Sequence, residues 1–124
     1  MPLVPALLAA ALLAAAAPAN APPQRAGECR WVHGRYAVYN GSGVRRIWVI
    51  GTRRIIALHD DDENIPPEID RYHARPNPGY GYDDALFGDF YVCARENSRP
   101  GWMQHVRLLR TRNLILRGRR FPGG

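Results

Sequence analysis

The hydrophobic and polar residues of this chain follow short alternating runs, which are typical of β-strands, and no long run has the 3.6-residue period of a helix. Runs rich in aromatic and β-branched residues are separated by clusters of Gly, Asn, Ser and Pro, which favour turns. These runs cover residues 29–39, 44–50, 53–59, 89–95 and 102–117. The sequence therefore predicts an all-β domain of five to six short strands.

The segments between these runs predict how the strands are connected. Residues 40–43 (NGSG) predict a hairpin, because Asn and Gly tolerate the positive φ of tight turns. Only Gly51 and Thr52 break the chain before the third run, so the first three strands form a meander. Residues 60–88 contain four prolines and an acidic run, and they predict a long loop with room for one helical turn. Residues 111–113 (TRN) predict a second tight turn inside the last run.

Three meandering strands, a variable connection and two further strands are the order of an oligonucleotide/oligosaccharide-binding (OB) barrel. The predicted strands resemble that arrangement, so we expect a small OB-like barrel. The alternatives are a strongly bent antiparallel sheet of the same strands or a small sandwich.

Residues 1–21 differ from the rest because they contain no charged side chain and are mostly Ala and Leu. Their apolar run, residues 6–17, is shorter than the roughly 20 residues that cross a bilayer, and it suits the core of a signal peptide. Cleavage is expected after Ala19, because cleavage after Ala21 would place Pro22 beside the scissile bond. An uncleaved membrane tether is the alternative.

We therefore expect four segments: a signal peptide (1–21), a flexible linker (22–28), a β domain (29–117) and a disordered tail (118–124). The expected location is the periplasm or the exterior, and the mature form should have no transmembrane helix. About a hundred residues remain after the leader, which is enough for one domain only.

The two cysteines, Cys29 and Cys93, both lie in the mature part of the chain. In an exported protein of this size they are expected to form a disulfide bond. A metal site or a redox centre is disfavoured, since no second cysteine lies near either one.

The net charge is +6, and all 17 basic residues other than histidine are Arg. The planar guanidinium pairs bidentately with carboxylates and phosphates. We expect the partner to be an anionic envelope component or another envelope protein, with solubility as the simpler explanation of the charge. Nucleic acid is a disfavoured partner, because it conflicts with export. The protein is expected to be a monomer and to need no cofactor.

Arginines alternate with aromatic residues in several places, and on an OB-like sheet such side chains could bind a ligand. The candidate ligand-binding residues are Arg46, Trp48, Arg53, Tyr80 and Tyr82. Because side chains alternate between the two faces of a strand, many of the aromatic residues should instead belong to the core.

The alternative function is a small periplasmic hydrolase or metal-dependent enzyme. It would use His33, His59 or His105 with the acidic residues 60–62. The histidines, including His73, show no metal-ligand spacing, and the acidic run lacks the calcium-loop pattern. We therefore predict neither catalytic nor metal-binding residues.

Four stretches of the domain carry a resemblance to other sequences: residues 29–35 (CRWVHGR), 39–41 (YNG), 46–53 (RIWVIGTR) and 88–93 (GDFYVC). They resemble a group of small uncharacterised exported bacterial proteins. The likeness spans residues 29 to about 116, and it implies no particular activity.

Overall fold

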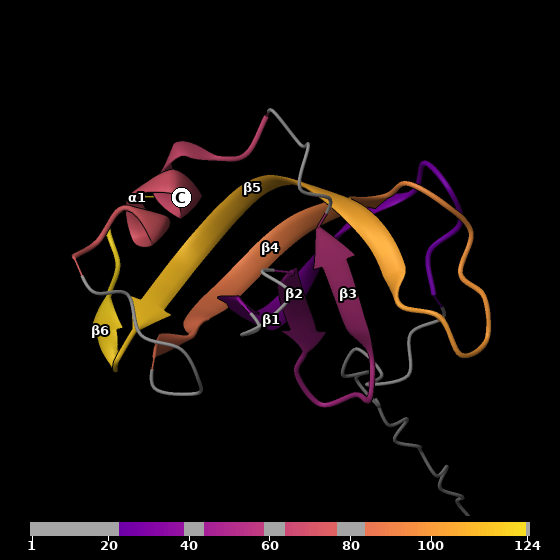
Figure 1. Ribbon diagram of the computed structural model, residues 1–124, viewed down its shortest axis with the longest axis horizontal. Helices are drawn as coiled ribbons and strands as arrows, with labels where there is room; N and C mark the ends of the chain where they lie inside the picture. Colours follow the sequence, from indigo (N-terminus) through magenta and orange to yellow (C-terminus); the bar gives the residue numbers. More distant parts are fainter. Residues whose placement is uncertain (1–22, 39–43, 59–63, 77–83, 124) are drawn as a thin grey trace, which may run out of the picture.

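The computed structural model describes residues 23–38, 44–58, 64–76 and 84–123. Its elements are β1 (Cys29–Val38), β2 (Arg45–Val49), β3 (Ile55–Leu58), α1 (Pro67–His73), β4 (Leu86–Ala94), β5 (Gln104–Leu116) and β6 (Arg119–Arg120) (Figure 1). The predicted leader lies outside the described residues. In the ranges that are described, the search for a helix with the length and apolar character of a membrane span finds none.

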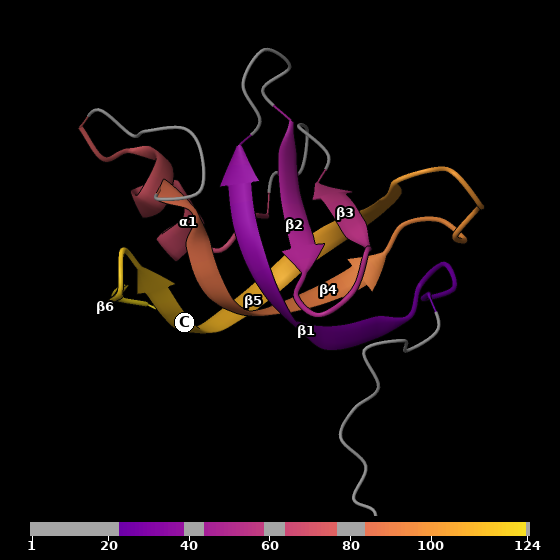
Figure 2. The same cartoon turned by 90° about the horizontal axis from the view of Figure 1, so that it is seen from below.

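Strands β1 to β5 close into a barrel. The sheet order is β3-β2-β1-β4-β5-β6, and a parallel pairing of β3 with β5 joins the two ends of the five-stranded part. Figure 2 shows β1 bending along its length. Its second half, from Gly34 to Val38, pairs with β2, and its residues from Cys29 to Tyr36 pair with β4. The predicted OB-like barrel is confirmed, and its closure makes the sheet mixed instead of purely antiparallel.

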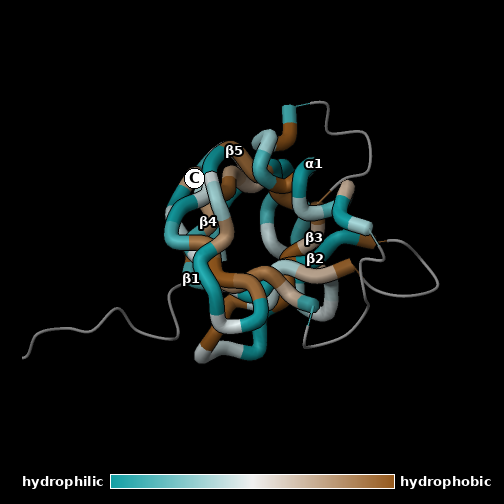
Figure 3. Tube along the Cα trace, turned by 90° about the vertical axis from the view of Figure 1, so that its left-hand side faces the viewer, coloured by the Kyte–Doolittle hydropathy of each residue, from teal (hydrophilic) through white to brown (hydrophobic). Residues whose placement is uncertain are grey.

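Hydrophobic and hydrophilic residues change along the strands, as the colours in Figure 3 show. Because successive side chains of a strand point to opposite faces, one set of them lies inside the barrel. Gly34 and Gly88 lie opposite each other in the β1–β4 register. A Cβ atom at Gly34 would lie 2.4 Å from Cγ2 of Ile47, and one at Gly88 would lie 2.8 Å from Cδ2 of Leu114. These two glycines let the bent strands approach the packed interior. The largest fully buried residues are Tyr36, Phe90, Ile47, Ile56, Ile69, Leu86, Leu108 and Leu114.

The predicted disulfide is confirmed. Cys29 and Cys93 are register partners in β1 and β4 and are covalently linked. The bond thus joins the first strand to the strand that follows the long connection.

Helix α1 lies in the connection that was expected to be a long loop. Pro67 stands in its first turn, where the missing N–H costs nothing, and Glu68 and Asp70 complement the positive end of the helix dipole. Ile69 and Tyr72 are buried in the core, and the buried Glu68 accepts a 2.5 Å hydrogen bond from Thr111 Oγ1. Arg75 and Arg117 form ion pairs with the buried Asp84 at 2.8 Å and 3.2 Å. These contacts fix the helix against one end of the barrel.

Residues 23–28, which were predicted to be a flexible linker, are hydrogen-bonded to the barrel in the structure. The Gln24 side chain is 1% exposed, and its Nε2 donates to the carbonyl oxygens of Glu28 and Val92. The amide of Ala26 donates to Oδ1 of Asn97. Long-range hydrogen bonds therefore order a segment whose composition alone favours flexibility.

Residues 118–123, which were predicted to be a disordered tail, contain the short strand β6 in the structure. Arg117 and Gly118 take positive φ values of 52° and 76° and make a turn, after which β6 pairs with the end of β5. Phe121 packs on the core, and its amide donates to the Leu114 carbonyl. Arg71 Nη2 donates to the carbonyl oxygen of Pro122. One aromatic anchor and a turn are enough to order the tail.

The predicted turn at residues 111–113 is a bulge within a continuous β5. Asn113 has a φ of 56°, and the β4–β5 register shifts between Phe87 and Asp89. The residues therefore have turn chemistry, but the strand pairing continues on both sides of them.

Candidate ligand-binding pocket

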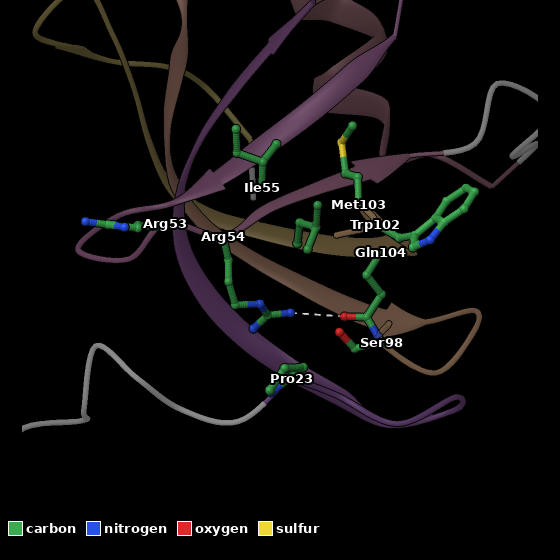
Figure 4. A pocket seen from close by; sticks show the side chains of 9 residues that line it. Pro23, Arg53, Arg54, Ile55, Ser98, Trp102, Met103 and Gln104 are labelled. Carbon is green, nitrogen blue, oxygen red and sulfur yellow. Dashed lines mark hydrogen bonds between the residues drawn. The ribbon is translucent and has the colours of Figure 1, made fainter. Parts of the chain in front are cut away.

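An open pocket of about 370 Å³ lies on the side of the barrel away from α1, where the β2–β3 turn, the N-terminal segment and the β4–β5 connection meet (Figures 1 and 4). Ile55, Trp102 and Met103 give it an apolar side, and Arg54 and Gln104 give it a polar side. This combination of apolar lining and few polar groups is typical of small-molecule sites.

The backbone and side chains of the β2–β3 turn hold Arg54 in place. Its amide donates to Oγ1 of Thr52 at 2.9 Å, and its carbonyl accepts from the Val49 amide at 3.0 Å. Its guanidinium Nη2 donates to Oε1 of Gln104 at 3.0 Å, and Figure 4 shows these two side chains pointing toward each other.

Gln104 is in turn fixed from behind. Its side chain is buried, and its Nε2 donates to the carbonyl oxygens of Gln24 at 2.7 Å and Glu96 at 2.9 Å. The amide therefore cannot rotate without losing two hydrogen bonds, so it presents its oxygen to Arg54.

The electrostatic environment of Arg54 is unfavourable for a cation. Burial, and after it the positive charge of Arg30, lower the pKa of the Arg54 guanidinium. Among the residues that the structure describes, no carboxylate lies within ion-pair distance of Arg54. A half-buried guanidinium that is hydrogen-bonded only to a neutral amide would be stabilised by an anion.

The opposite rim of the pocket is formed by an aromatic side chain. Trp102 is 65% exposed, and the Arg99 guanidinium lies 4.4 Å from the centre of its ring system. Met103 beside it is half-buried. An exposed Trp next to a flexible Met provides an adaptable apolar surface.

The structure places three of the predicted binding residues in one region of the barrel. Arg53 lines the pocket, but its side chain extends away from Arg54 (Figure 4). Trp48 is the register partner of Ile55, and its indole N–H donates to the Thr52 carbonyl at 2.8 Å. Arg46 lies farther along β2, opposite Ala57. Tyr80 and Tyr82 lie outside the described residues.

Arg54, Trp102 and Met103 were not predicted as site residues. The sequence pattern begins a strand at residue 53 and another at residue 102, whereas β3 begins at Ile55 and β5 at Gln104. Arg53 and Arg54, like Trp102 and Met103, therefore lie in connections and not in strands. The one sequence feature that could have indicated a binding site here is the pair Arg53–Arg54 beside a turn.

The described residues of the enzyme alternative, His33 and His105, pair with different carboxylates. His33 Nδ1 lies 3.0 Å from Oδ1 of Asp89, whereas His105 Nδ1 lies 3.4 Å from Oε2 of Glu96. Hydrogen bonds from Asn113, His33 and Arg112 outweigh the effect of burial and lower the pKa of Asp89. Within the described ranges, no group of three His, Cys, Asp or Glu side chains is placed to hold a metal ion. His59 and residues 60–62 lie outside those ranges.

Comparison of the chain with protein-family models, curated proteins and solved structures finds no match. The resemblance to small exported bacterial proteins therefore stays a prediction. The function has to be inferred from the residues of this chain alone.

Proposed function

We propose that this protein is an exported, non-enzymatic binding module that takes a small anionic ligand with an apolar body into the pocket at Arg54. The observation that supports it is the half-buried Arg54, which donates to a neutral amide and has no carboxylate partner among the described residues. A bound carboxylate or phosphate would supply the missing counter-charge. Ile55, Met103 and Trp102 would cover the apolar body of the same ligand.

The binding experiment uses isothermal titration calorimetry with 1-naphthoate and its neutral analogue 1-naphthamide. The Arg54→Gln variant should weaken naphthoate binding by about ten-fold or more, since a hydrogen bond to a charged group contributes about 1.5–3 kcal/mol. The matched control is Arg119→Gln, which removes the same charge from an exposed position on β6. Naphthamide should bind weakly and equally to all three proteins.

Two outcomes would overturn the proposal. One is the absence of naphthoate binding at millimolar concentration, and the other is an equal loss of affinity in Arg54→Gln and Arg119→Gln. The second outcome would mean that the net charge attracts the anion and that the pocket does not.

Export is proposed because residues 1–21 have the pattern of a signal peptide, and a disulfide is compatible with an oxidising compartment. Mass spectrometry of the protein from its native host should find a mature chain that begins at Asn20. A chain that keeps its first 19 residues would contradict cleavage there.

A further inference from the structure

The outer face of β1, β4 and β5 carries a continuous stack of two rings and two guanidinium groups, which we call the Arg–aromatic stack. Trp31 is the register partner of Tyr91, and Tyr91 is the register partner of Arg110. The Trp31 and Tyr91 ring centres are 5.2 Å apart. The Arg112 guanidinium lies 4.0 Å from the Trp31 ring centre, and that of Arg110 lies 5.4 Å from the Tyr91 ring centre. Each end of the stack is therefore a cation.

An ionic row next to the stack fixes Arg112 further. Its Nε donates to Oδ2 of Asp89 at 3.2 Å, and Nδ2 of Asn113 donates to the same oxygen at 3.1 Å. His33 occupies the other oxygen of Asp89. The terminal Nη nitrogens of Arg112 have no hydrogen-bond partner among the described residues. Arg112 thus has a fixed position and still has donors to offer.

The positive charge continues along β5. Arg107 is the register partner of Cys93, one row beyond Tyr91, and it is exposed. Neither Arg107 nor Arg110 has a carboxylate partner within the part of the chain that the structure describes. The sequences of β1, β4 and β5 contain one acidic residue, Asp89, which Arg112 and His33 already engage. The face is therefore a line of three cations with one carboxylate, and among the described residues Arg107 and Arg110 have no matching anion.

We propose that this face is a second binding surface, on which Arg107, Arg110 and Arg112 bind successive carboxylates of an extended acidic polysaccharide. Outward positions two residues apart on a strand, such as Arg110 and Arg112, are about 7 Å apart, and Arg107 follows beyond a register shift of the β4–β5 pairing. The surface therefore suits a linear polymer with repeated charges. The aromatic rings hold two of the guanidiniums in place, which lowers the entropy that binding costs. The proposal does not depend on the pocket at Arg54.

A polysaccharide fits this surface better than the two other common polyanions. Single-stranded nucleic acid binds by stacking bases on open aromatic faces, but each ring here already packs against a guanidinium and against the other ring. An anionic membrane is met by an exposed apolar face flanked by cations, whereas Trp31 and Tyr91 here are half-buried and each packs against a guanidinium. A polymer held by charge alone needs neither feature.

The experiment measures binding of fluorescently labelled polygalacturonate to the full chain as a function of salt. The wild-type affinity should fall linearly with salt on a log–log scale, as expected when bound counterions are released. The double variant Arg110→Gln/Arg112→Gln should lose about ten-fold or more in affinity and show a shallower slope. The control is Arg119→Gln/Arg120→Gln, which removes the same charge from β6 and should change the affinity by less than about two-fold.

A third variant tests whether the stack itself matters. Trp31→Leu keeps all the charges but removes the support of Arg112, and it should weaken binding by about two- to five-fold. Thermal unfolding of each variant shows whether it is folded. Naphthoate binding should be unchanged in all of them, which separates this proposal from the pocket.

Several results would overturn the proposal. They are equal affinity of the wild type and the Arg110→Gln/Arg112→Gln variant, an equal loss in the β6 control, and equally tight binding of fully methyl-esterified polymer. Tighter binding of a single-stranded oligonucleotide or of anionic lipid vesicles would identify a different partner and would also refute it.

Discussion

Removal of the Cys29–Cys93 disulfide should be one of the largest single losses of stability available in this fold. The two cysteines are 64 residues apart in sequence, so the bond restricts more than half of the chain in the unfolded state. In the chain-entropy model a closed loop of this length contributes about 4 kcal/mol. The native state should change little, because β1 and β4 stay paired from residue 30 onward without the bond.

The double variant Cys29→Ala/Cys93→Ala should therefore lose about 3–4 kcal/mol in the free energy of unfolding, measured by urea denaturation. At 4–8 °C per kcal/mol this corresponds to a fall of about 12 °C or more in Tm. The m-value should rise, since the unfolded chain is no longer cross-linked and exposes more surface. Wild-type protein reduced with a phosphine should match the variant. A loss below about 1 kcal/mol with an unchanged m-value would refute the reasoning.

Two further predictions concern the interior. Gly34→Ala should lower the free energy of unfolding, measured by urea denaturation, by about 1–3 kcal/mol. The reason is that its Cβ would lie 2.4 Å from Ile47 Cγ2 and 3.1 Å from the Trp48 carbonyl oxygen. A loss under about 0.5 kcal/mol would show that the barrel can expand there. Burial, and after it the charge of Arg45, lower the pKa of His73 from 6.5, so the folded state disfavours the protonated ring. The contribution of His73 to stability is therefore complete above pH 6.5 and is lost as the pH falls from there toward its lower folded pKa. The difference in unfolding free energy between wild type and His73→Gln should shrink over that interval, and a difference that does not vary with pH would contradict this.

The groups around the His73 ring determine its protonation. Its Nε2 shares a 2.5 Å hydrogen bond with the Tyr36 hydroxyl, and its ring contacts Tyr72 edge-on. Arg45 and Arg75 oppose its protonation, whereas Asp70 favours it. Burial also raises the pKa of the Tyr72 hydroxyl to about 12 and raises that of Tyr36, so neither phenol ionises in the interval of the test.

The strands could be predicted because their signal is local. Alternation and turn residues predicted the first four strands to within a few residues, and the count of cysteines predicted the disulfide. Asn113 shows where a local signal becomes ambiguous. A positive φ suits both a tight turn and a bulge. Only the β4–β5 pairing on either side of Asn113, Asp89 with Arg112 and Phe87 with Ile115, decides between them.

Residues 23–28 and 118–123, where the structure differs from the sequence prediction, are held by distant partners. Gln24 is fixed by Val92 and Gln104, and Phe121 by Leu114, all of which are far away or on another element. The same holds for the pocket. Arg54 differs from Arg53 only in the direction that the β2–β3 turn gives its side chain, and no sequence pattern contains that direction.

The distribution of charge supports the proposal that the positive excess of this protein serves binding. Three of its described carboxylates are engaged within the fold: Asp84 by two arginines, Asp89 by Arg112 and His33, and Glu68 by Thr111. Arg54 in the pocket and Arg107 and Arg110 on the outer face of β5 have no such partners among the described residues. If the charge served solubility alone, nothing would require Arg54 to be half-buried or Arg112 to be fixed between a ring and a carboxylate. Both arrangements cost conformational entropy, which an anionic ligand would offset by gaining donors that are already in position.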